Sequence, residues 1–323
     1  MCSLFAIVFL IIYGFESFMG TTTSAFIVAV NLVSWAKGTI LSHNDQILLS
    51  IGLSSLCVQG TSVTAVFSFF FCTQLFVGFH LQVFVFFFMF SNSSYFWLST
   101  FLLVYYTMKV MNTQQPFFLW VKTKIIKNIF WLLLNCFVSS FGFGLTTAYN
   151  VSTTVLSETA ANLTGNYSKP SILFNNGFYM RLFFIILECT CPLAVTSFLV
   201  IQLLKGIWSH AQNMKKSMAG SGVATLNAHR SATNTLTSLL ILCVSFHLMM
   251  SVVILGILPY YSIGFLICMT LISILTSAQA VTFVLRNPKL KKKALGILQS
   301  FRPSTAKSHG QTTGDISYVT SPL

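Results

Sequence analysis

The chain has 323 residues, of which 55% are hydrophobic and 7% are charged. A water-soluble globular protein carries about 25% charged residues, so this composition excludes a soluble fold. The 18 basic and 5 acidic residues give a net charge of +13, but the basic residues lie in short clusters between long apolar runs. That arrangement is typical of a polytopic membrane protein and not of a nucleic-acid-binding surface.

Seven stretches reach the length of about 20 apolar residues that a helix needs to cross the hydrocarbon of a bilayer. We therefore predict an all-α membrane protein, a bundle of seven transmembrane helices. The predicted spans cover residues 4–34, 46–71, 83–110, 128–148, 180–207, 235–257 and 264–285. A short basic juxtamembrane helix follows the last span, so that the membrane domain covers residues 1–301. Residues 302–323 are rich in Ser, Thr, Pro and Gly and are expected to form a disordered cytoplasmic tail.

The basic residues predict the direction of the spans. One set of connecting segments, together with the C-terminal tail, carries 16 of the 18 Lys and Arg residues, and the other side carries Lys169 and Arg181. Cytoplasmic loops collect positive charge, so we expect the N-terminus outside and the C-terminus in the cytoplasm.

Glycosylation sequons agree with this direction. Asn150, Asn162 and Asn166 fall in the segment 149–178, which is predicted to be an extracellular loop. Asn162 and Asn166 lie deepest in that loop and are the expected acceptors. The sequon at Asn92 lies within a span and is interpreted as accidental.

The sequence offers little reaction chemistry. No two histidines have the i,i+4 spacing of a zinc site, and no phosphate-binding glycine loop or nucleophile elbow is present. The long outer loop contains no cysteine, which excludes a disulfide from it to the third span. We expect no catalytic residue, metal or cofactor. The spans hold Glu16, Glu188 and His247 and no internal repeat, which favours a receptor over an enzyme, pump or transporter.

Five segments in order carry a resemblance to a known family. The last span ends in the string NPKLK at 287–291, where proline stops the helix at the membrane edge. This chain resembles the bitter taste receptors, the type 2 taste receptor family of G-protein-coupled receptors. The other similar segments are VNLVSWAKG with LSHNDQILLSIGLSS (30–38, 41–55), FWLSTFLLVYYTMKV (96–110), Pro192 to His210, and Ala228-His229-Arg230.

The resemblance implies an agonist pocket between the third, fifth, sixth and seventh spans. The candidate ligand-binding residues are Phe88, Asn92, Glu188, Phe246, His247 and Met269, of which His247 is chosen because it is polar at mid-span. For Asn92 an interhelical hydrogen bond is the alternative role, and for Phe246 contact with lipid. Glu188 is interpreted as a counter-ion for cationic ligands, as a structural contact of Arg181, seven residues earlier, or as a protonated acid bonded to a neighbour.

The resemblance also implies coupling to a gustducin-like heterotrimeric G protein at the plasma membrane. The candidate coupling residues are Lys109, Lys122, Lys124, Lys127, His210, Lys215, Lys216 and His229. Membrane topology alone would also explain these basic residues. A different class of function, a seven-span ligand-gated channel or transporter, is the alternative, and measured current or flux without a G protein would favour it.

Four positions depart from the usual family pattern: Ser24, Ser55, Thr233 and Gln279. The first two positions pair to lock the inactive state in many members, so the sequence leaves that lock in doubt here. Glu16 matches a first-span acid that recurs in the family, and we interpret it as structural.

Overall fold

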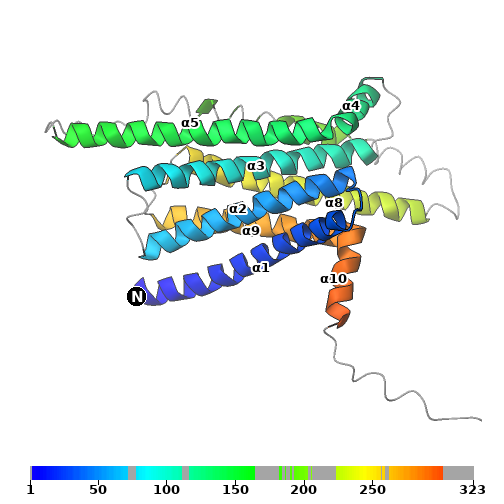
Figure 1. Ribbon diagram of the computed structural model, residues 1–323, viewed down its shortest axis with the longest axis horizontal. Coiled ribbons are helices and arrows are strands. Elements are labelled where there is room, and N and C mark those ends of the chain that lie inside the picture. The colour runs from blue at the N-terminus through cyan, green and yellow to red at the C-terminus, as the bar shows by residue number, and fades with distance from the viewer. Residues whose placement is uncertain are drawn as a thin grey trace, which may run out of the picture.

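The computed structural model describes residues 2–71, 78–110, 116–163, 182–183, 186, 190, 193–202, 205, 223–255, 257–258 and 262–300. Within these ranges the long elements are helices, and most of them pack side by side into one bundle (Figure 1). They are α1 (Cys2–Ala36), α2 (His43–Phe71), α3 (Gly78–Val110), α4 (Pro116–Lys127), α5 (Ile129–Leu163), α8 (Val223–Ile254), α9 (Ile263–Arg286) and α10 (Pro288–Ser300).

Six helices of the described ranges are long and apolar enough to cross a membrane, and they correspond to six of the seven predicted spans. The predicted span 180–207 lies mostly outside the described residues, but a shorter apolar helix, Leu193–Gln202, falls within it. The chain is thus a helical multi-pass membrane protein.

Helix α5 is longer than the sequence suggested. It continues to Leu163, so that the first part of the expected loop 149–178 is helical. The reason is local, because residues 150–163 contain neither Gly nor Pro, and the first such residue after the span is Gly165. Sequence hydropathy places the membrane boundary near Tyr149, but a helix does not need to end where it leaves the bilayer.

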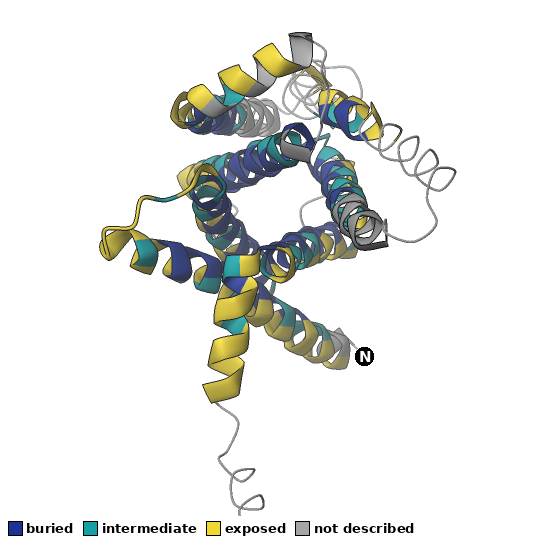
Figure 2. Cartoon of the chain, turned by 90° about the vertical axis from the view of Figure 1, so that its right-hand side faces the viewer, coloured by how far each residue is buried: buried dark blue, intermediate teal, exposed yellow. Residues whose placement is uncertain are grey.

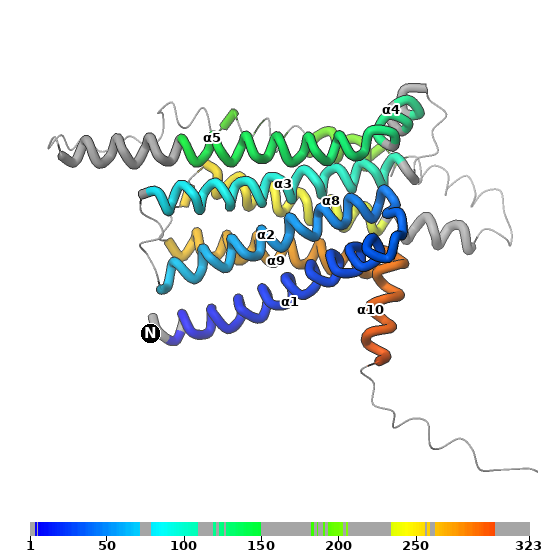
Figure 3. The backbone as a smooth tube through the Cα atoms, in the orientation of Figure 1, coloured from blue at the N-terminus to red at the C-terminus, as the bar shows by residue number. Residues whose placement is uncertain are grey.

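Helices α1, α2, α3 and α5 alternate in direction along the chain, and α9 runs opposite to α8 (Figure 1). The start of α1 lies at one end, and α4, the α1–α2 connection and α10 lie at the other (Figures 1 and 3). Helix α10 leaves the bundle at a steep angle to the long axes of the other helices (Figure 3). We call the end that carries α4 and α10 the basic end, since Lys124, Lys127 and Lys291–Lys293 lie there.

Polar side chains set the helix ends at this basic end. Ser42 caps α2 by accepting the backbone N–H of Asp45 at 3.2 Å. Asn287, between α9 and α10, accepts the backbone N–H groups of Lys289 and Leu290 through its Oδ1. Pro288 then occupies the first position of α10, where a missing N–H costs nothing. The turn between the seventh span and the juxtamembrane helix is thus encoded by the Asn-Pro pair.

Helices α3 and α9 hold the centre of the bundle. Helix α3 packs against α2, α5 and α8, and α9 packs against α1, α2 and α8. Their inward faces are buried, whereas the outer faces of the bundle are exposed (Figure 2). The exposed side chains include Phe15, Phe18, Trp131 and Phe198, which suit contact with lipid.

Candidate functional site

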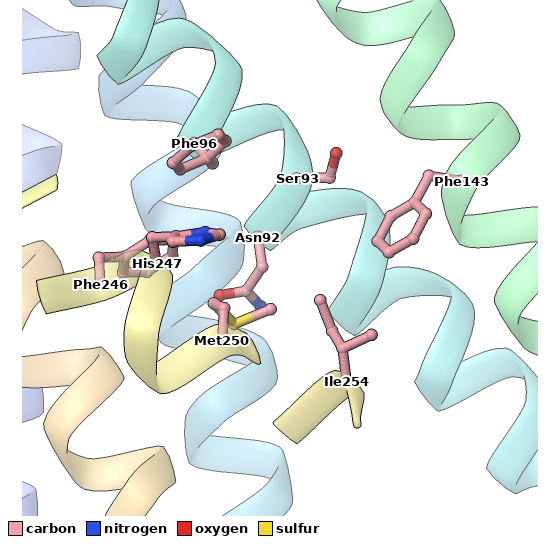
Figure 4. Close-up of a pocket in the computed structure, with 8 residues that line it drawn as sticks. All are labelled: Asn92, Ser93, Phe96, Phe143, Phe246, His247, Met250 and Ile254. Atoms are coloured by element: carbon pink, nitrogen blue, oxygen red, sulfur yellow. The ribbon is translucent and has the colours of Figure 1, made fainter. Parts of the chain in front are cut away.

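A small cavity lies between α3, α5 and α8 in the half of the bundle away from the basic end. Its lining is mainly apolar, and Figure 4 shows the side chains around it. The lining residues are Asn92, Ser93 and Phe96 from α3, Phe143 from α5, and Phe246, His247, Met250 and Ile254 from α8. The space open to a water-sized sphere is about 10 Å³, which is room for about one water molecule. A larger ligand therefore requires the lining side chains to move apart.

Two polar side chains face this cavity with an atom that lacks a partner among the described residues. Asn92 is fully buried and donates its Nδ2 to the backbone oxygen of Phe88 at 2.8 Å, while its Oδ1 has no hydrogen-bond partner. His247 is 8% exposed, and its Nδ1 is also without a hydrogen-bond partner. Figure 4 shows the two side chains approaching each other from α3 and α8. Leaving such groups unpaired costs about 1–3 kcal/mol each, so a ligand that pairs with them gains that energy.

The third polar lining residue is already engaged. Ser93 donates a hydrogen bond to the hydroxyl of Ser140 on α5 at 3.1 Å. The available polarity of the cavity therefore comes from Asn92 and His247.

An aromatic and amide cluster lies one helical turn closer to the basic end. The ring of Phe246 lies 5.4 Å from that of Tyr95, measured between centroids. The Tyr95 hydroxyl donates to Oε1 of Gln279 on α9. The Nε2 of Gln279 in turn donates to the sulfur of Cys243 on α8 at 3.3 Å. Phe246 thus both lines the cavity and contacts a group of side chains that connects α3, α8 and α9.

The structure brings together three of the sequence-predicted ligand residues, Asn92, Phe246 and His247. Phe88 lies one turn before Asn92, buried and stacked on Phe84, and supplies the carbonyl that holds the Asn92 amide. Met269 is buried in the core of the bundle and is not among the residues that line this cavity. Glu188 and Arg181 lie outside the described residues.

Sequence reasoning did not identify five lining residues: Ser93, Phe96, Phe143, Met250 and Ile254. Helical spacing could have identified part of this set, because Phe96 is four residues after Asn92 and Met250 is four after Phe246. Phe143 comes from another helix, and no local pattern links it to the site.

The candidate coupling residues lie at the basic end where they are described. Lys124 and Lys127 are exposed on α4, and the ammonium of Lys124 lies 5.6 Å from the ring centroid of Trp120. For Lys109 in α3, Lys122 in α4 and His229 in α8 the structure describes the backbone, and their side chains lie outside the described set. His210, Lys215 and Lys216 lie outside the described residues.

Two of the departures from the family pattern, Ser24 and Ser55, contact each other. Their hydroxyls lie 2.8 Å apart, fully buried between α1 and α2. A neutral hydrogen bond thus joins α1 to α2 at these positions. Gln279, another departure, joins three helices as described above, and the side chain of Thr233 lies outside the described set. Of the expected glycosylation acceptors, Asn162 lies in α5 and Asn166 lies outside the described residues.

Sequence comparisons place the chain among known proteins. The family model described as taste receptor protein (TAS2R) matches residues 1–302. The chain is similar to taste receptor type 2 member 40 of Gallus gallus, with 27% identity over 313 residues that cover 92% of this chain and 96% of that protein. It is also similar to member 8 of Gorilla gorilla gorilla, with 26% identity over 73% of this chain and 76% of that protein. For member 7 of Macaca mulatta the identity is 25%, over 88% of this chain and 90% of that protein.

Proposed function

The chain belongs to the taste receptor protein (TAS2R) family, the bitter taste receptors, and from this membership we propose that it is a G-protein-coupled receptor of the plasma membrane. It binds small bitter compounds in the cavity between α3, α5 and α8. Agonist binding shifts an equilibrium between inactive and active arrangements, and the active form engages a gustducin-like heterotrimeric G protein at the basic end. The mechanism requires that the agonist bind the active form better than the inactive form.

This proposal rests on two residues that line one cavity, each with a buried polar atom that has no hydrogen-bond partner. These atoms are Asn92 Oδ1 and His247 Nδ1. The Asn92 oxygen accepts a hydrogen bond and cannot donate one, so the favoured agonist presents a hydroxyl or N–H group to it. The rest of the lining favours an apolar or aromatic body. Because the cavity is small, the agonist separates α3 from α8. This movement displaces Phe246, which lines the cavity, and with it the Tyr95 ring that Phe246 contacts.

The direction of the helices supports seven crossings with the N-terminus outside. Helix α5 runs towards the end where α1 begins, and α8 starts from the basic end (Figure 1). An odd number of crossings therefore separates them, and the apolar helix Leu193–Gln202 lies in that interval. The exposed lysines of α4 and α10 share the basic end, and cytoplasmic segments collect positive charge. These lysines would face the acidic surfaces of a G protein or anionic lipid.

The test is calcium imaging of cells that carry this receptor with a promiscuous G protein, screened against bitter compounds. We expect Asn92→Leu, which removes the acceptor at similar size, to weaken an active agonist that has a hydroxyl or N–H group by about 10-fold or more, as expected for the loss of one buried hydrogen bond. Ser91→Ala is the matched control, because Ser91 is the next buried residue, bonds to the same Phe88 carbonyl and does not line the cavity.

Two results would refute the proposal. Equal loss of potency in Asn92→Leu and Ser91→Ala would show that the cavity is not the agonist site. Ligand-dependent current or flux in reconstituted membranes that contain no G protein would favour the channel or transporter class.

A further inference from the structure

Helix α10 is a short helix that the rest of the protein covers very little. The structure describes all of its 13 residues, and among them Leu290 is the buried one. From Lys291 to Ser300 the helix is exposed, apart from the half-buried Ala294. A helix of about 12–15 residues is marginal in water on its own, and Gly296 weakens this one further. The helix therefore needs another surface against which to pack.

The apolar residues of α10 form one stripe along the helix. With about 100° of rotation per residue, four of them fall within an arc of about 100°. The stripe comprises Leu290, Ala294, Ile297 and Leu298. Lys293 and Lys291 come directly beyond its two edges, and Lys292 lies on the opposite side. An apolar stripe flanked by lysines is typical of a helix that lies in a membrane surface, with the apolar side chains among acyl chains and the lysines at the headgroups.

The start of α10 lies at the level expected for the lipid headgroups. Lys289 in its first turn bonds to Asn31 of α1 at 3.3 Å, and Asn31 is one turn before Trp35. Exposed tryptophans at helix ends mark the boundary between hydrocarbon and water. Three of them lie near the basic end on different helices: Trp35, Trp120 and Trp131. The steep angle of α10 to the long helices keeps the rest of it near this level (Figure 3).

The stripe is on the side of α10 that is turned towards the bundle. Leu290 belongs to the main hydrophobic core, so the helix face that carries it points to the other helices. Ile297 comes seven residues later, two turns further along nearly the same face. There α10 has extended outward from the bundle, as the view of the basic end in Figure 2 shows. At that place the bilayer lies on the bundle side of α10, whereas a cytoplasmic protein would meet the opposite side, which carries Lys292.

We propose that α10 binds the surface of a bilayer that contains acidic lipid. Its stripe packs among the acyl chains, and Lys291 and Lys293 bind anionic headgroups. The charges are complementary, because α10 carries four lysines and no acidic residue. The lipid stabilises the part of the helix that follows Leu290. This inference does not depend on the agonist cavity, on the G protein or on the side of the membrane that the basic end faces.

Hydrogen–deuterium exchange of the intact receptor in lipid nanodiscs tests the proposal. One set of nanodiscs contains phosphatidylcholine alone, and the other also contains phosphatidylserine. We expect the backbone amides of residues 294–300 to exchange more slowly in the acidic nanodiscs, by about fivefold for each lysine at the surface. High salt should remove this difference, because it screens exposed charges. Lys293→Gln should reduce the difference more than Lys292→Gln does.

Ile297→Ala and Leu295→Ala form a matched pair that tests which side of α10 contacts lipid. The two side chains are 47% and 48% exposed, but Leu295 lies about 60° beyond the edge of the stripe. Alanine favours a helix at least as well as either residue, so faster exchange cannot come from helix preference. In acidic nanodiscs we expect Ile297→Ala to speed the exchange by at least about fivefold, and Leu295→Ala to change it little.

Three results would overturn the proposal. The first is equal exchange of residues 294–300 in neutral and acidic nanodiscs, a comparison that needs no variant. The second is an equal effect of Ile297→Ala and Leu295→Ala. The third is slow exchange that begins only when a G protein is added, which would assign this helix face to a protein partner. A receptor that responds to no bitter compound would refute the proposed function and leave this inference intact.

Discussion

Gly20 on α1 is a sensitive probe of how closely α1 approaches α2 and α9. A Cβ atom built at Gly20 would overlap Ser277 Oγ and lie 2.6 Å from Gln59 Nε2. In Gly20→Ala both side chains must move, which disturbs the hydrogen bonds between Ser277 and Glu16 and between Gln59 and Ser277. Overpacking a close contact costs about 1–3 kcal/mol, and each disturbed hydrogen bond adds about 0.5–1.5 kcal/mol. The helix preference of Ala over Gly returns about 1 kcal/mol. We expect a net destabilisation of about 1–5 kcal/mol.

Gly14→Ala is the matched control on the same helix. A Cβ at Gly14 meets nothing within 4 Å, so this substitution gains helix preference without a clash. The assay is thermal unfolding of the detergent-solubilised receptor, followed by the loss of monodisperse protein after heating. We expect the midpoint to fall for Gly20→Ala and to equal or exceed wild type for Gly14→Ala. If the two variants have the same midpoint, α1 does not approach α9 as closely as described.

Three further predictions concern the polar contacts between helices. Gln279→Leu leaves the buried Tyr95 hydroxyl without its amide partner, so we expect the thermal stability to fall by about 1–2 kcal/mol. We also expect higher agonist-independent signalling in a second-messenger assay. Unchanged basal signalling would contradict the idea that Gln279 stabilises the inactive arrangement. Lys289→Met removes the partly exposed ion pair with Asp45, so we expect the free energy of unfolding to fall by less than about 1 kcal/mol. In a double-mutant cycle, adding Asp45→Asn to this variant should lower that free energy little further. Ser24→Ala should lower the free energy of unfolding by about 1 kcal/mol, because it removes the hydrogen bond to Ser55. If adding Ser55→Ala lowers it by the same amount again, the two hydroxyls are not coupled.

The helices could be predicted from the sequence because the bilayer fixes their length and composition. The expected spans 46–71 and 264–285 end within three residues of α2 and α9. The same reasoning placed a loop from residue 149, where α5 is still helical. Hydropathy reports where a segment leaves the hydrocarbon, whereas the helix end depends on capping and breaking residues, and the first of these after the span is Gly165.

The polar contacts could be predicted less well than the helices. The resemblance selected Asn92 and Phe246, and polarity at mid-span selected His247; the structure places all three around one cavity. It left the Ser24–Ser55 contact in doubt, because both positions depart from the residues that are usual in the family. Whether they meet depends on how closely α1 approaches α2, and that distance is a property of the packed bundle that no local sequence pattern encodes.

The polar contacts of α9 with its neighbouring helices differ in strength. Helix α9 is bonded to α1 and α2 through Ser273 and Ser277, and its continuation α10 is bonded to both helices again through Lys289. At the level of Gln279, by contrast, the bond from α9 to α8 ends on the sulfur of Cys243, a weak acceptor. The polar contact described here between α9 and α8 is thus weaker than those between α9 and the helices α1 and α2. Under the proposed function, an agonist that widens the cavity would act on α8, because this helix carries four of the cavity-lining residues.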